Sequence, residues 1–226
     1  MLSIHAPRDV LLKLPLFPLH TVFFPGMTLP LHIFEPRYRE MINLCLDDGL
    51  PFGVVLIRSG PEVGGDAQPH PVGTYGSISR VERLPDGRLN IEVVGQERFR
   101  VLDLHRDRAY LTGTLEKFPL RDADGPGAVH CARRLVPWIT RYLKLLGDAA
   151  ELALDQQAMP VRPAALAYLA AIIAQVPMAE KQLLLNCVTT EEMLERERAL
   201  YRRELSLIRA MLTSPQARHN ADISPN

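Results

Sequence analysis

The spacing of hydrophobic positions changes once along the chain, near the segment RDADGPG at residues 121–127. Before this segment, short apolar runs with strand-like alternation are separated by turns rich in proline and glycine. After it, apolar residues recur every three or four positions, which is typical of amphipathic helices. The pattern predicts an α+β protein with a β subdomain at 10–120, a helical subdomain at 126–212 and a disordered tail at 213–226.

The β subdomain is expected to form a small, curled, barrel-like sheet of about six or seven strands with one short helix. The helix begins at Glu35-Pro36, because proline suits the first helical position. The clearest hairpin is VERLPDGRLNIEVV at 81–94, where Pro85, Asp86 and Gly87 favour a tight turn. Other strands are predicted at 14–19, 28–34, 51–57, 98–104 and 110–118, with a loop at 58–71 and a bulge near Val101.

The helical subdomain is expected to contain a helix over residues 129–146 that is kinked or broken at Pro137. Further helices are predicted from Pro163 to Val176, over residues 180–188 and over residues 191–212. Thr190 is the expected N-cap of the last helix, whose broad apolar face lies opposite a strongly charged side.

Composition and charge exclude several classes of partner. The chain has 226 residues and a formal net charge of zero. Even the arginine-rich stretch 80–108 holds nearly as many acidic as basic residues, so we expect cross-strand ion pairs rather than nucleic-acid binding. The longest apolar helical run is too short to cross a bilayer, and the N-terminus lacks the features of a signal peptide. We therefore expect a cytoplasmic protein that binds no membrane.

No arrangement of residues predicts catalysis, a cofactor or a metal. The chain lacks a phosphate-binding glycine loop, a nucleophile elbow and a zinc-protease motif. Cys45, Cys131 and Cys187 fall in apolar helical patterns, where a free cysteine acts as a small hydrophobe. His20 and His32 lack an evident third ligand, so structural roles are favoured over a metal site.

A long segment resembles the start of the Lon N-terminal domain, the substrate-binding domain of Lon proteases. The matching residues are Pro15, Phe17, Pro18, the FPG at 24–26 and LPLHIFEPRYR at 29–39. The similarity continues through VGT at 72–74, LPDG at 84–87, Gly95 with Arg98, and EKQLLL at 180–185. It covers about residues 14–212 and implies a PUA-like β-barrel followed by a helical bundle.

The resemblance implies a role in binding rather than in cleavage. A full Lon protease continues into a nucleotide-binding motor and a protease domain, and neither is recognisable in these 226 residues. It therefore implies a stand-alone substrate-binding domain that is no enzyme, needs no cofactor, and binds a polypeptide segment or a protein partner.

Six residues are the candidates for polypeptide binding: Phe23, Phe24, Phe34, Glu35, Arg37 and Tyr38. The three phenylalanines either form an exposed apolar patch or fill the interface between barrel and helices. Glu35, Arg37 and Tyr38 either form a recognition rim or cap the helix and pair with a neighbouring charge.

A second hypothesis is a regulatory or scaffold protein that associates through its last helix. The oligomeric state is open at this point, and the identity of the partner is not encoded in any motif.

Overall fold

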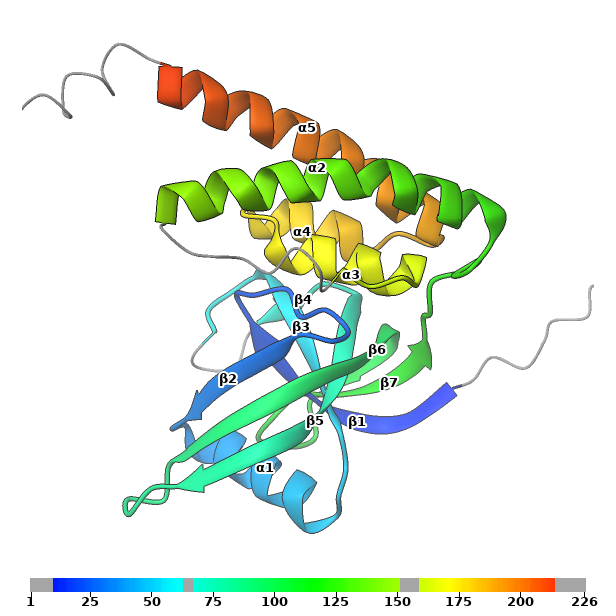
Figure 1. Ribbon diagram of the computed structural model, residues 1–226. Helices are drawn as coiled ribbons and strands as arrows, with labels where there is room; N and C mark the ends of the chain where they lie inside the picture. Colours follow the sequence, from blue (N-terminus) through cyan, green and yellow to red (C-terminus); the bar gives the residue numbers. More distant parts are fainter. Residues whose placement is uncertain (1–9, 63–66, 151–158, 214–226) are drawn as a thin grey trace, which may run out of the picture. The chain divides into compact units, whose positions relative to one another are not determined.

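The computed structural model of the protein describes residues 10–62, 67–150 and 159–213, and Figure 1 shows the elements within them. The strands are β1 (Val10–Leu19), β2 (Thr28–Ile33), β3 (Phe52–Ser59), β4 (Gln68–Pro69), β5 (Val72–Arg83), β6 (Leu89–His105) and β7 (Thr112–Lys117). The helices are α1 (Pro36–Asp47), α2 (Pro126–Ala150), α3 (Pro163–Ile173), α4 (Met178–Leu185) and α5 (Thr190–Thr213). This mixture of strands and helices confirms the α+β class. The tail at 213–226, for which we expect disorder, lies outside the described residues from residue 214 on.

The strands form one seven-stranded sheet in the order β1-β7-β6-β5-β3-β4, with β2 paired to β6. β1 pairs in parallel with β3 and antiparallel with β7. The sheet therefore closes on itself through the strands β1, β7, β6, β5 and β3. β6 is long enough to pair with β2 and β7 along different parts of one edge. The bulge expected near Val101 is confirmed by a register shift between Val101 and Asp103.

The predicted hairpin is formed by β5 and β6, which run side by side to the turn (Figure 1). Gly87 adopts a φ of 80° at this turn and donates its N–H to the carbonyl of Leu84 at 2.9 Å. The Asp86 carboxylate accepts the N–H of Arg88 at 3.0 Å. Pro85, Asp86 and Gly87 therefore occupy turn positions that their backbone and side-chain preferences favour.

One face of α1 completes the main apolar core of the sheet. Its buried residues Tyr38, Met41, Ile42 and Cys45 pack with residues of several strands. The ring of Tyr38 meets that of Phe17 edge-on, with the ring centroids 4.1 Å apart.

The chain forms two compact units that do not follow each other in sequence. The described residues within 1–121 and 171–188 form the first unit, and those within 122–170 and 189–226 form the second. In this division α4 groups with the strands, and the helical subdomain at 126–212 remains a prediction.

Two buried polar side chains attach α4 to the sheet. Arg98 of β6 donates to the carbonyl oxygens of Leu185 and Cys187 at 2.5 and 2.8 Å. Gln182 of α4 donates to the carbonyl of Val72 at 3.0 Å. The bonds from Arg98 satisfy carbonyl groups at the C-terminal end of α4, which is a short helix.

The second unit contains the long helices α2 and α5, which pack side by side (Figure 1). α2 continues through Pro137, so of the kink or break expected there, the break does not occur. The N-cap of α5 is Thr189 rather than Thr190, because the Thr189 hydroxyl accepts the N–H of Glu192 at 3.1 Å. Among the described residues, none of the helices combines the length and the apolar character needed to span a membrane.

Candidate functional site

Phe23 and Phe24 are buried, so the prediction of an exposed patch that includes them is not met. Their side chains are 1% and 0% exposed, and Phe23 belongs to the main apolar core. The segment that follows them is fastened to β6 by backbone hydrogen bonds between Gly26 or Met27 and Gly95. Neither side chain can contact a partner in this conformation.

Phe34 is the one of the three that lies on the surface. Its side chain is 51% exposed, and its ring stacks on that of His32 with the centroids 6.2 Å apart. The Nδ1 atom of His32 lies 2.7 Å from Oδ1 of Asn90 on the neighbouring strand. The imidazole is thus held in place and supports the phenyl ring.

A surface groove of about 380 Å³ lies over β2, β5 and β6, beside His32. It is lined by Pro30, Leu31, His32, Arg80, Glu82, Asn90, Ile91 and Glu92, and we call it the β2 groove. Its charged groups are paired across the strands: Arg80 lies 3.6 Å from Glu92, and Asn90 donates to Glu82 at 3.0 Å. The expected cross-strand ion pairing is therefore present between Arg80 and Glu92, whereas the Glu82 carboxylate accepts from the neutral amide of Asn90.

Glu35, Arg37 and Tyr38 lie together at the start of α1. Glu35 occupies the N-cap position, but its carboxylate makes no capping hydrogen bond and instead accepts from Nε of Arg37 at 2.9 Å. The Arg37 guanidinium lies 4.3 Å from the centroid of the Tyr38 ring, in cation–π geometry. Of the structural role expected as the alternative to a recognition rim, the pairing of Glu35 with a neighbouring charge is present and the capping is not.

Arg37 and Tyr38 also line a second hollow, of about 70 Å³, which we call the arginine pocket. Its walls are Pro18, Arg37, Tyr38, Glu62, Ala67, Arg106, Arg108, Ala109, Tyr110 and Leu111. Sequence reasoning missed it, because Arg106 and Arg108 follow β6 and meet Arg37 only through the fold. Their run of arginines was interpreted as a source of ion pairs on the sheet.

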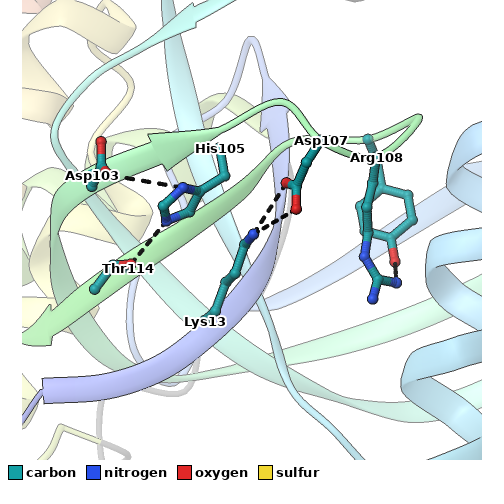
Figure 2. A network of polar contacts seen from close by, with 7 residues as sticks. Lys13, Asp103, His105, Asp107, Arg108 and Thr114 are labelled. Atoms are coloured by element: carbon teal, nitrogen blue, oxygen red, sulfur yellow. Dashed lines mark hydrogen bonds and ion pairs between the residues drawn. The ribbon is translucent and has the colours of Figure 1, made fainter.

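A nearby polar network contains the residue types of a catalytic triad but not its geometry. Figure 2 shows His105 between Thr114 and Asp103, beside the pair of Lys13 and Asp107. Nε2 of His105 lies 2.9 Å from the Thr114 hydroxyl, but its Nδ1 lies 3.8 Å from the Asp103 carboxylate. That separation is too long for a hydrogen bond, and the Asp103 side chain is 71% exposed, whereas a triad needs a firmly held acid.

The cysteines offer no activated nucleophile. All three are buried and free of disulfides. Burial raises the pKa of the Cys45 thiol to about 11, and burial together with the Glu195 carboxylate has the same effect on Cys131. These thiols keep their protons at neutral pH. Among the described residues, no cluster of three or more His, Cys, Asp or Glu side chains could hold a metal ion.

Comparison with protein families gives one match that spans most of the chain. Residues 13–202 match the family described as the ATP-dependent protease La (LON) substrate-binding domain. The chain is 29% identical over 184 residues to a Lon protease of Anaeromyxobacter dehalogenans, and 28% identical over 188 residues to Lon protease 2 of Syntrophobacter fumaroxidans. The matches cover 80% and 81% of this chain but 22% and 23% of those relatives, so the chain spans less than a quarter of their length.

Two solved structures share the fold. The crystal structure of a Lon N-terminal domain protein from Xanthomonas campestris matches with a TM-score of 0.63 and 28% identity, covering 84% of this chain and 98% of the other. The N-terminal domain of the Mycobacterium avium complex Lon protease matches with a TM-score of 0.66 at 18% identity, covering 84% and 97%. The second likeness concerns the fold alone.

Proposed function

This chain belongs to the LON substrate-binding domain family, and from that premise we propose that it binds polypeptide segments and catalyses no reaction itself. The matched part of Lon is its substrate-binding part and not its protease part. The buried, protonated thiols and the poorly aligned Asp103, His105 and Thr114 support a role in binding. We further propose that the closed strand pairing is a PUA-like barrel, and that the protein acts in the cytoplasm in connection with proteolysis.

The observation that carries this proposal is the exposed ring of Phe34 beside the β2 groove. Large apolar side chains that remain on the surface next to a hollow are frequent anchors for a bound chain. The exposed Pro30 extends the apolar surface along the groove, while Arg80 and Glu92 neutralise each other. An unfolded polypeptide exposes apolar side chains that this surface can cover.

The edge of β2 provides backbone groups for an extended chain. Among the described strands, β2 pairs with β6 alone, so its other edge can accept a further strand. Pro30 lies in the middle of β2 and has no N–H to donate. It limits the backbone hydrogen bonds available at this edge, which favours weak and reversible binding and discourages pairing of two copies.

A binding titration with the substitution Phe34→Ser tests the proposal. The probe is a permanently unfolded, fluorescently labelled protein whose anisotropy rises when it is bound. Loss of a central aromatic anchor should weaken binding at least about tenfold, since such residues contribute on the order of 2 kcal/mol. Leu207→Ser is the matched control, because Leu207 is 48% exposed but lies on α5.

The control also tests the second candidate function, association through α5. If Leu207→Ser abolishes binding and Phe34→Ser leaves it unchanged, the binding surface is on α5 and the proposal for β2 is refuted. The same samples incubated with ATP should show neither cleavage of the probe nor hydrolysis of ATP. Either activity would overturn the assignment of a binding role without catalysis.

A further inference from the structure

Three guanidinium groups surround the arginine pocket, and each is held in place by at least one hydrogen bond. Arg37 donates to the carboxylate of Glu35 and to the carbonyl of Glu62, at 2.9 and 3.1 Å. Arg106 donates to the carbonyl of Ala67 at 3.1 Å. Arg108 donates to the hydroxyl of Tyr110 at 2.8 Å, the contact visible at Arg108 in Figure 2. For Arg37 and Arg108, these contacts occupy only part of a group that carries five N–H donors.

The charge of the pocket is positive. Its described lining contains the three arginines and one carboxylate, that of Glu62, and the Glu35 carboxylate pairs with Arg37, so these groups together carry a formal charge of +1. The neighbouring Asp107 carboxylate is paired with Lys13. The hollow of about 70 Å³ is well above the ~10–15 Å³ that one water needs, so a small polar group fits inside it.

Two tyrosine hydroxyls add neutral donors. Tyr38 is buried and lines the pocket, yet none of the described residues forms a hydrogen bond with its hydroxyl. Burial raises the pKa of Tyr38 to about 12, so the hydroxyl keeps its proton and can donate it. Tyr110 accepts a hydrogen bond from Arg108 and still has its own O–H to give.

We propose that the arginine pocket binds a carboxylate group. Planar guanidinium groups match the two oxygens of a carboxylate, and fixed donors lose little freedom on binding. The formal charge of +1 suits a single anionic group with its neighbouring polar atoms rather than a chain of phosphates. The carboxylate comes from an acidic side chain or the C-terminus of a bound polypeptide, or from a free small acid; the first source rests on the proposed function.

Calorimetric titration with matched ligands tests this site. Three N-acetylated peptides share one apolar sequence: the first has a single glutamate and an amidated C-terminus, the second has glutamine and a free C-terminus, and the third has glutamine and an amidated C-terminus. Succinate represents the free small acid, and inorganic phosphate represents a different anion. Circular dichroism and thermal melting check that every variant is folded.

We expect one or both carboxylate peptides, or succinate, to bind at least about tenfold more tightly than the peptide without a carboxylate, because hydrogen bonds between charged groups are the strong ones. The double substitution Arg106→Gln with Arg108→Gln should reduce this preference to below about twofold. Arg83→Gln with Arg100→Gln removes the same charge from residues that do not line the pocket and should keep the preference. Tyr38→Phe, which deletes only the hydroxyl, should weaken carboxylate binding about threefold or more.

Several results would overturn the carboxylate site. The first is equal binding of all three peptides together with no binding of succinate. The second is a preference for carboxylate ligands that survives the substitution of Arg106 and Arg108. The third is binding of phosphate as tight as that of the carboxylates. Failure of the proposed function gives a different pattern: Phe34→Ser has no effect on peptide binding while succinate still binds and requires Arg106 and Arg108.

Discussion

At the scale of single residues, Glu197 is the side chain most at odds with its surroundings. It is fully buried on the inner face of α5, with Met193, Leu194 and Tyr201. Neither carboxylate oxygen has a hydrogen-bond partner among the described residues. Burial raises the pKa of this carboxyl well above its usual value of 4.5. The folded state therefore holds the proton more tightly than the unfolded chain does.

This difference predicts that Glu197 makes the protein less stable as the pH rises. At a pH above the unfolded pKa, the unfolded chain releases the proton and the folded chain retains it, so unfolding becomes more favourable until the folded pKa is reached. Substitution Glu197→Gln removes this effect. The stability of the variant minus that of the wild type should increase between pH 5 and pH 8, by up to about 1.4 kcal/mol per pH unit.

Urea unfolding at several pH values, followed by the fluorescence of Trp138, gives this comparison. Trp138 is the only tryptophan of the chain and lies on α2, in the same unit as Glu197. If the difference in unfolding free energy between the variant and the wild type stays constant from pH 5 to pH 8, Glu197 ionises alike in the folded and unfolded states, which contradicts the prediction.

At the scale of elements, the loop between β1 and β2 is held by its contact with β6. The N–H of Gly26 donates to the carbonyl of Gly95 at 2.8 Å, and the N–H of Gly95 donates to the carbonyl of Met27 at 2.9 Å. Gly26 has a φ of 80°, which glycine adopts without strain. The FPG segment is thus a turn that brings the chain close to β6 and directs Phe23 and Phe24 inward.

Substitution Gly95→Ala should disrupt this contact. A Cβ atom at residue 95 would lie 2.3 Å from the carbonyl oxygen of Phe24, which is backbone and cannot move aside alone. We expect a loss of about 1–3 kcal/mol of unfolding free energy, the usual effect of overpacking. Gly125→Ala is the control, since its nearest neighbour would be 3.5 Å away. Equal melting temperatures for the two variants would contradict the close approach.

The sequence predicts elements well where local chemistry decides them. The β5–β6 turn, the start of α1 at Pro36 and the start of α3 at Pro163 follow from proline, aspartate and glycine preferences. β4 was missed because two residues carry no periodic signal, and β5 was recognised only from Val81 on, although it begins at Val72. Its first part is buried on both faces, with small residues such as Gly73 and Thr74, and so shows no alternation.

At the scale of the whole chain, the grouping of elements depends on contacts that a periodic pattern cannot reveal. The helical spacing at 180–188 predicts α4 correctly but does not indicate its neighbours. The neighbours of α4 are set by two buried polar residues, Arg98 and Gln182. Each of them hydrogen-bonds to a carbonyl that lies far away in the sequence. Nothing in their local sequence distinguishes them from exposed polar residues.

The candidate site was predictable in the same uneven way. Strand parity placed the side chain of Phe34 opposite the core face, and it lies on the surface. For Phe23 and Phe24, which lie in a loop, parity gives no information, and both are in the interior. The arginine pocket joins residues from β1, α1 and the β6–β7 connection, so only the folded chain brings it together.

Hydrogen–deuterium exchange in the presence of a permanently unfolded polypeptide tests the central claim most directly, because it locates the bound surface without a substitution. The account predicts slower exchange in residues 28–38 and 89–92, where β2, the start of α1 and the adjoining part of β6 lie. Protection confined to residues 190–213 would place binding on α5, and unchanged exchange at a saturating polypeptide concentration would contradict a polypeptide-binding role altogether.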